Sequence, residues 1–223
     1  MYTMLSQELH SHTSRQEIGT AMFTSSSEMK MRKQEARKLA RTARHQIWHE
    51  MQRNDRLSPN LMAQRFINEF KLSENDVVAL TLSIGDELDL LPLMQALSDQ
   101  RIPMALPRVT SINAALSFRA YRISDRLDFE LFGTRAPLAT AKEVYPTVMI
   151  VPMLAFNREG YRLGYGGGFY DRSIASLKRN KHQFITVGMA YSAQECEELP
   201  TEAHDAKLDY ILTEKEFIKI RDC

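Results

Sequence analysis

The segment TVMIVPMLAF, residues 147–156, is the most apolar run of the chain and constrains the fold more than any other feature. It has no polar face, so it predicts a strand that is covered on both sides. The segment VVALTLS, residues 77–83, predicts a second buried strand of this kind. Strands covered on both faces are typical of parallel sheets, because the helices that connect parallel strands lie over the faces.

Helical patterns alternate with these strands. The first helix extends to about residue 53, opens after a capping-box pattern at residues 25–28, and carries an apolar stripe at helical spacing: Ala36, Leu39, Ala40, Ala43, Ile47, Trp48 and Met51. Ser58-Pro59 starts a second helix to about residue 70, and further helices are predicted at 89–100, at 171–179 and from Ser192 to Pro200. The remaining strands are predicted at 102–109, 116–121, 184–191 and 208–214, the last of which closes the sheet. We therefore predict a single-domain α/β fold, a three-layer αβα sandwich with a mainly parallel sheet.

Composition narrows the class of protein. The chain has 223 residues and a formal net charge of +1, which suits one domain and disfavours a strongly basic nucleic-acid-binding protein. The two cysteines, Cys196 and Cys223, are too few for a disulfide framework, so we expect a cytoplasmic protein. No apolar run is long enough for a membrane span. Residues 1–28 are aperiodic and lack the apolar core of a signal peptide, so we expect a mobile N-terminal extension before a domain at 29–223.

Glycine is concentrated in the segment RLGYGGGFYDR, residues 162–172. It holds four of the nine glycines of the chain and follows the most apolar strand, where loops of α/β sheets bind ligands. Glycine lets backbone N–H groups approach an anion closely. The segment is neither a P-loop nor a dinucleotide fingerprint, because Phe169 stands where a lysine or a small residue is needed. A flexible surface turn is the alternative to a phosphate-binding loop.

Three charged neighbours favour phosphate. Arg162 and Arg172 could each supply forked hydrogen bonds, although Arg172 by itself reads better as a solvated helix charge. Asp171 offers a hard oxygen ligand for Mg²⁺, or the cap of the helix that begins near Arg172.

A basic segment lies in the first helix. Residues 30–44 carry seven positive charges against Glu35 alone, and Lys33, Arg37, Arg41 and Arg44 fall on one face beside the apolar stripe. This face could be solvated, could bind a nucleic-acid groove, or could reach anionic groups held by the glycine loop. The spacing leaves these three interpretations open.

Four collinear segments resemble the 5-formyltetrahydrofolate cyclo-ligase family, also called 5,10-methenyltetrahydrofolate synthetase. The longest is VPMLAFNREGYRLGYGGGFYDR (151–172), and the others are KQEAR (33–37), LSIGDELD (82–89) and LPTEAHDAKLDYILTE (199–214). The sequence departs from the family pattern at Leu90, Met153, Asn157 and Phe169.

The resemblance implies an ATP- and Mg²⁺-dependent ligase that cyclises 5-formyltetrahydrofolate to 5,10-methenyltetrahydrofolate and releases ADP and phosphate. The implied ATP-binding residues are Lys33, Gln34, Glu35, Ala36, Arg37, Arg162, Leu163, Gly164, Tyr165, Gly166, Gly167, Gly168, Phe169 and Tyr170. The implied folate-binding residues are Leu82, Glu87, Tyr165, Gly166, Gly167, Gly168 and Phe169, and the implied Mg²⁺ ligands are Asp171 and Asp205. Residues 29–223 would then be the catalytic domain of a monomer that acts on small molecules, with no nucleic-acid or membrane partner.

Two other functions remain to be tested. A non-catalytic sensor of a phosphorylated metabolite would keep the glycine loop and a basic residue but need neither the Mg²⁺ carboxylates nor Glu87. A nucleic-acid-binding module would use the basic helix and bind any duplex with a steep salt dependence.

Overall fold

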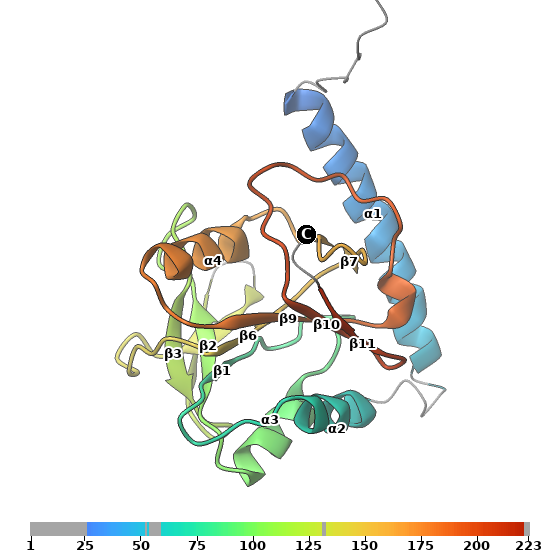
Figure 1. Ribbon diagram of the computed structural model, residues 1–223. Helices are drawn as coiled ribbons and strands as arrows, with labels where there is room; N and C mark the ends of the chain where they lie inside the picture. The colour runs from blue at the N-terminus through green and yellow to red at the C-terminus, as the bar shows by residue number, and fades with distance from the viewer. Residues whose placement is uncertain (1–25, 52, 54–58, 131–132, 221–223) are drawn as a thin grey trace, which may run out of the picture.

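The computed structural model describes residues 26–51, 53, 59–130 and 133–220. Seven strands form its central sheet in the order β11 (Phe217–Lys219), β10 (Tyr210–Leu212), β9 (Ile185–Met189), β6 (Val148–Val151), β1 (Val78–Ala79), β2 (Met104–Arg108) and β3 (Ser117–Tyr121) (Figure 1). The five inner strands, β10 to β2 in this order, run parallel, and β3 and β11 pair antiparallel at the two edges. The predicted α/β fold with a mainly parallel sheet is confirmed.

Helices cover both faces of this sheet. α2 (Pro59–Glu69) and α3 (Leu91–Asp99) lie on one face, and α4 (Phe169–Arg179) lies on the other (Figure 1). Phe66 of α2 and Leu97 of α3 belong to one buried cluster with side chains of the sheet. Ile174 and Leu177 of α4 belong to a second cluster, on the opposite face. Two separate cores, one on each face, are what the three-layer prediction requires.

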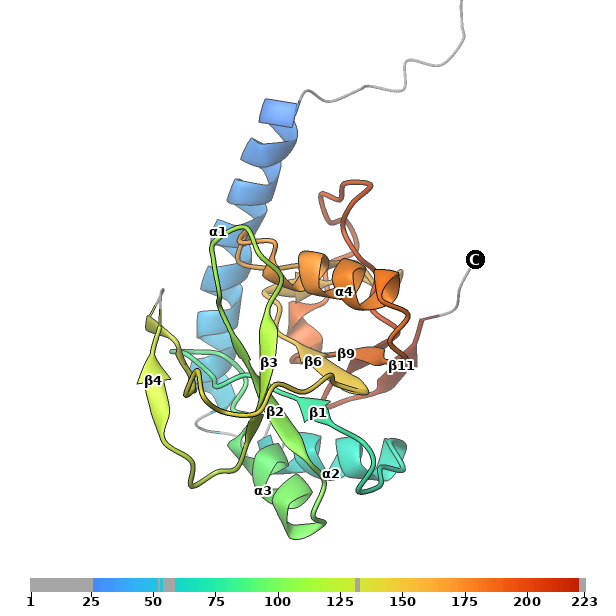
Figure 2. The same ribbon diagram turned by 90° about the vertical axis from the view of Figure 1, so that its left-hand side faces the viewer.

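The first helix, α1 (Ser26–Met51), stands at the edge of the layers and extends beyond them at its N-terminal end (Figures 1 and 2). It contacts η3 (Ser192–Gln194), which follows β9, and β8 (Arg162–Leu163), which follows β6 along the chain. α1 therefore crosses the carboxyl ends of the parallel strands, the edge at which ligands of such sheets bind.

The apolar stripe predicted for α1 is wrong at two of its seven positions, Leu39 and Ala43, and the other five residues are buried or half-buried. Leu39 is 65% exposed and Ala43 is exposed, whereas Lys33, Arg44 and Ile47 are buried. The buried side thus includes the cationic residues, which hydrophobic spacing cannot anticipate because their anionic partners lie elsewhere in the chain.

The apolar run 147–156 forms two strands rather than one. Pro152 has no N–H to donate, so β6 ends at Val151 and the chain resumes as β7 (Ala155–Phe156), which pairs with β8. This hairpin carries the chain away from the sheet and into the glycine loop. The strand predicted at 77–83 is likewise shorter, since only β1 is paired.

The chain also forms elements that the sequence did not predict. β4 (Leu127–Phe129) and β5 (Arg135–Pro137) pair antiparallel in a stretch for which no strand was predicted. The strand predicted at 208–214 does not close the sheet, because β11 pairs outside it. α4 begins at Phe169 after Gly168 in the left-handed conformation (φ 66°), so Asp171 is not its cap.

The predicted extension, residues 1–28, falls outside the described residues except for Ser26–Glu28, which form the first turn of α1. Within the described part of the chain, no helix is both long and apolar enough to cross a membrane.

Candidate functional site

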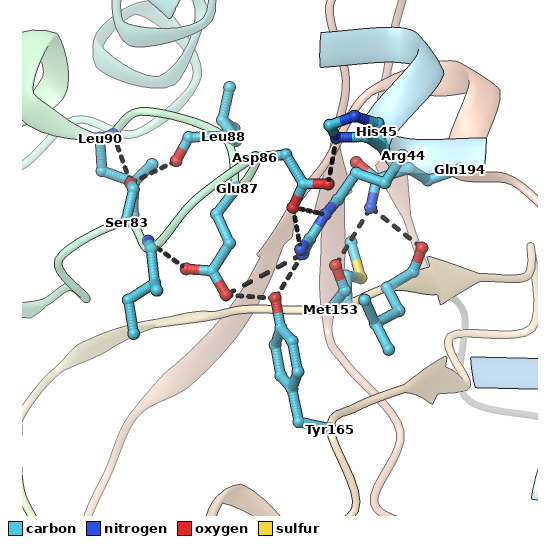
Figure 3. Close-up of polar contacts among 12 residues, drawn as sticks. Arg44, His45, Ser83, Asp86, Glu87, Leu88, Leu90, Met153, Tyr165 and Gln194 are labelled. Carbon is cyan, nitrogen blue, oxygen red and sulfur yellow. Dashed lines mark hydrogen bonds and ion pairs between the residues drawn. The ribbon is translucent and has the colours of Figure 1, made fainter. Parts of the chain in front are cut away.

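The glycine loop, residues 164–168, connects β8 to α4 and is contacted by two other parts of the chain. Arg37 of α1 donates from Nε to the Gly164 carbonyl at 2.9 Å. Arg44, also of α1, donates to the hydroxyl of Tyr165, and that hydroxyl donates to Glu87 (Figure 3). The site therefore assembles from α1, the segment after β1 and the loop before α4.

We call Arg44, Asp86, Glu87 and Tyr165 the pocket network (Figure 3). The Arg44 side chain is only 7% exposed, and its Nε lies 3.1 Å from Oδ1 of Asp86. Its Nη1 lies 3.9 Å from Oε1 of Glu87, and the other Glu87 oxygen accepts from the backbone N–H of Ile84 at 3.0 Å. One buried cation thus joins two carboxylates and a phenol.

Electrostatics shift the pKa values of Arg44 and Tyr165 in the pocket network. Burial lowers the pKa of Arg44, but its contacts with Tyr165 and Asp86 outweigh burial and raise that pKa overall. Burial, and next the charge of Glu87, raise the pKa of the Tyr165 phenol above its ordinary value. Arg44 therefore stays charged, and Tyr165 stays a protonated donor to Glu87.

A small pocket of about 20 Å³ opens beside the network. Arg44, Glu87 and Tyr165 form its polar side, and its apolar side includes Leu88, Leu90, Ile150, Met153 and Met189. Apolar side chains with a few convergent polar groups are the lining typical of a small-molecule site. Leu82, predicted to line the pocket, is partly buried against the adjoining core.

We call Lys33 and Arg37 the cationic pair. The Lys33 Nζ lies 2.6 Å from Asp205 Oδ2 and 2.8 Å from Glu202 Oε2, although it belongs to the first helix. Burial, and next the charge of Arg41, lower the pKa of Arg37. The guanidinium of Arg37 faces Gly166, whose φ is +100° and whose added Cβ would lie 3.2 Å from Arg37 Cζ. Arg37 thus contacts the glycine loop, whereas Lys33 pairs with Glu202 and Asp205, and anion binding by either residue stays a prediction.

The three residues between Lys33 and Arg37 are less buried than Lys33. Gln34 and Glu35, predicted to bind ATP with them, are exposed, and Ala36 is half-buried. Leu163, on the other side of the site, is buried beneath the loop.

Arg162 holds the loop in place. Its side chain is 4% exposed, with Nη1 donating to the Ala206 carbonyl at 2.6 Å and Nη2 to Asp171 Oδ1 at 2.8 Å. The same Asp171 oxygen accepts from the Ala206 N–H at 3.1 Å. Arg162 as a phosphate donor remains a prediction, and its contacts here join β8, α4 and the segment at 206.

Arg172 is not the solvated charge that the sequence favoured. It donates to the carbonyls of Ala114 and Ile112, both at 3.0 Å, and its guanidinium lies 4.9 Å from the centre of the Phe169 ring. Arg172 therefore ties α4 to the loop between β2 and β3. Tyr170 lies on the other side of the same turn, and burial raises the pKa of its phenol.

The carboxylates predicted to hold Mg²⁺ come from two parts of the chain, α4 and the segment before β10. Asp171 is bonded to the N–H of Ala206, the residue that follows Asp205. Glu202, His204 and Asp205 offer ligand atoms within 4.8 Å of one another. Carboxylate oxygens are the donors that Mg²⁺ takes, so the residues present fit this ion, and the assignment to Asp171 and Asp205 stays a prediction.

Sequence reasoning missed three residues of the site. Arg44 was placed on the basic face but given no role, and Asp86 was passed over for its neighbour Glu87. Gln194, which lines the pocket, donates to the carbonyls of Met153 and Leu154 at 3.0 and 3.1 Å. A signal for Arg44 does exist, because it follows Lys33 and Arg37 at spacings that keep all three on one side of a helix.

The departures from the family pattern have ordinary structural roles. Leu90 is buried at the pocket wall, and Asn157 Oδ1 accepts from the Tyr161 N–H at 3.0 Å inside the β7–β8 hairpin. Met153 packs against Gly188 of β9, where an added Cβ would lie 2.6 Å from the Met153 methyl.

Fold and site define an α/β protein with a small-molecule pocket at the carboxyl ends of its parallel strands. A sequence model of the 5-formyltetrahydrofolate cyclo-ligase family matches residues 29–214, and the chain belongs to this family. Among its relatives, the 5-formyltetrahydrofolate cyclo-ligase of Haemophilus influenzae is 32% identical over 68% of this chain and 82% of that protein. The enzyme of the same name from Escherichia coli K12 is 35% identical over 61% of this chain and 76% of that protein.

The fold agrees with this membership. The solution structure of Aquifex aeolicus 5,10-methenyltetrahydrofolate synthetase superposes with a TM-score of 0.62 at 29% identity, covering 83% of this chain and 94% of that one.

Proposed function

We propose that the protein converts 5-formyltetrahydrofolate and MgATP into 5,10-methenyltetrahydrofolate, ADP and phosphate. Family membership and the names of the relatives support this reaction. The observation that carries it is the hydrogen bond between Tyr165 of the glycine loop and Glu87 of the pocket, since it puts an anion-binding loop and a ring-binding carboxylate in one network.

The chemistry explains why such a pairing is needed. The N5-formyl group is amide-like, so its carbon is a poor electrophile and its oxygen a poor leaving group. Transfer of the γ-phosphoryl group of ATP to that oxygen gives an iminium phosphate and releases ADP. N10 then attacks the activated carbon and loses its proton, and the C–O bond breaks to release phosphate. The protein's task is to place the two reactants and to neutralise the developing charge.

The pocket network binds the folate. Glu87 accepts paired N–H donors from the pterin ring, which take the place of the Tyr165 hydroxyl, while the apolar wall covers the ring face. Arg44 contacts no reacting atom in this scheme. It is a positioning residue, since it holds Asp86 and Tyr165 and lies 3.9 Å from Glu87.

The glycine loop binds the triphosphate. Backbone N–H groups of residues 164–168 and the N-terminus of α4 point positive partial charge at the anion. Arg37 and Lys33 add full charges from α1, and Asp171 and Asp205 would hold Mg²⁺. The metal ion supplies charge neutralisation on the triphosphate when bound.

The test mixes purified protein with MgATP and 5-formyltetrahydrofolate and follows the ultraviolet absorbance of methenyltetrahydrofolate. We expect product from wild type and from Lys38→Ala, an exposed α1 control, and little product from Glu87→Gln. Arg162→Ala and Asp171→Ala are less informative, because both residues hold the loop together. Binding of ATP without product would support the metabolite sensor instead.

A further inference from the structure

Three ring-bearing residues lie together at the C-terminal end of α1 and take no part in the proposed reaction. His45 and His49 are one turn apart, and their Nε2 atoms lie 3.1 Å from each other. The Trp48 ring lies between them in sequence, with its centre 6.3 Å from the ring centre of His45 and 5.1 Å from that of His49. Both histidines are exposed.

The spacing of the two Nε2 atoms suits two ligands of one metal ion. Histidine nitrogens bind transition metals at about 2.0–2.1 Å. Two nitrogens on one ion therefore lie about 2.8–3.4 Å apart when the angle at the metal is between about 90° and the tetrahedral angle. The observed 3.1 Å falls within this range without any movement of the helix. Residues at i and i+4 face the same way, which is why His-x-x-x-His on a helix is a recurrent metal-binding arrangement.

A carboxylate orients the first of the two rings. The Nδ1 atom of His45 lies 3.4 Å from Oδ2 of Asp86, whose other oxygen pairs with buried Arg44 (Figure 3). Histidines that bind metals commonly give their second N–H to such a carboxylate, which leaves the other nitrogen as the free lone pair. Asp86 therefore favours the His45 tautomer in which Nε2 is the ligand.

We propose that His45 and His49 form a binding site for a divalent transition-metal ion of the copper, nickel or zinc type, with water completing the coordination. Imidazole ligands select these ions over Mg²⁺, which takes oxygen, so the site is distinct from the carboxylates near Asp205. The positive charge one turn earlier does not point at it, because the Arg41 guanidinium lies over the Tyr165 ring, 5.9 Å from its centre. The proposal goes beyond the folate reaction and does not depend on it.

Trp48 is the only tryptophan of the chain and reports directly on this site. Titrating the full, untagged chain with Cu²⁺ or Ni²⁺ should quench tryptophan fluorescence saturably at one ion per chain. Zn²⁺ should compete with that quenching without causing it, and Cu²⁺ should bind more tightly than Ni²⁺. Isothermal titration calorimetry with Zn²⁺ gives the stoichiometry independently of the fluorophore.

Variants decide whether the ion sits between the histidines. His45→Ala and His49→Ala should each weaken binding at least tenfold, whereas His204→Ala, in the acidic cluster near Asp205, should leave it unchanged. Asp86→Asn should weaken binding by about tenfold without abolishing it, since it removes only the orienting carboxylate. Both histidines are exposed, so their variants keep the fold, which circular dichroism verifies. Absence of Zn²⁺ binding to wild type, or unchanged quenching in the double His45→Ala/His49→Ala variant, would overturn the proposal.

Discussion

Arg37 and Arg44 lie on one side of the same helix, two turns apart, and have different partners. Arg44 is enclosed by Asp86, Glu87 and Tyr165, so its charge is already balanced. Arg37 donates a hydrogen bond to the carbonyl of Gly164, and its guanidinium faces Gly166. The comparison teaches that the partners, not the residue type or the spacing, distinguish the arginine that we propose to position the pocket from the one that we propose to bind phosphate.

The pKa shifts express the same difference. The pKa of Arg44 is raised because its contacts with Tyr165 and Asp86 outweigh burial, whereas burial and the neighbouring Arg41 lower the pKa of Arg37. An incoming anion would relieve the unfavourable environment of Arg37 and gain nothing comparable at Arg44.

Among variants that test this difference between Arg37 and Arg44, we expect Arg44→Ala to have the largest effect. It leaves Asp86 and Glu87 without their buried cation, so we expect it to lower the free energy of unfolding by about 2–4 kcal/mol. Arg41→Ala, which removes an exposed arginine of the same helix, should change it by less than about 0.5 kcal/mol. Urea denaturation measures both, and equal losses would mean that Arg44 is not the centre of the network.

Kinetics with the two substrates separate the two ends of the site. Glu87→Gln should raise KM for 5-formyltetrahydrofolate by about 10–100-fold and leave KM for ATP unchanged, because it removes a charged acceptor from the pocket only. Arg37→Ala should do the reverse, raising KM for ATP by a similar factor. If each variant raised both KM values alike, the assignment of separate pockets would be wrong.

Substitutions at Gly166 and Gly164 test the contact between the glycine loop and Arg37. Gly166→Ala forces a side chain into a φ of +100° and against the Arg37 guanidinium, so we expect a loss of about 1–3 kcal/mol in stability together with weaker ATP binding. Gly164→Ala is the matched control, since an added Cβ there meets nothing within 4 Å. Thermal unfolding of the two variants should differ clearly, and equal melting temperatures would contradict the strain argument.

The smallest effect concerns Tyr165 and depends on pH. Tyr165→Phe removes the hydrogen bonds to Arg44 and Glu87 and should cost about 0.5–1.5 kcal/mol. The folded-state pKa of this phenol is raised above 10, so its contribution is complete below pH 10 and is lost as the pH rises further. The stability difference between wild type and variant should therefore narrow above about pH 10 in urea titrations. A constant difference up to pH 11.5 would contradict the raised pKa.

Much of the fold could be predicted because its signals are local. The apolar runs at 77–83 and 147–156 mark buried strands, and the alternation of strands with helices predicts the parallel sheet. The prediction failed at some strand boundaries and at one edge of the sheet. Pro152 divides the second run, and β11 closes the sheet although residues 217–219 carried no strong strand signal.

The sequence by itself determined the glycine loop, the basic helix and the family resemblance, because each is written in neighbouring residues. Only the tertiary structure decided which charges are buried and what they contact. The partners of α1 are remote in sequence: Asp205 lies 172 residues from Lys33, and Tyr165 lies 121 residues from Arg44. Hydrophobic periodicity predicts that Lys33 and Arg44 are exposed, because it considers only how favourably each side chain interacts with water. In the folded chain a carboxylate or a phenol takes the place of that water, and the charge can be buried.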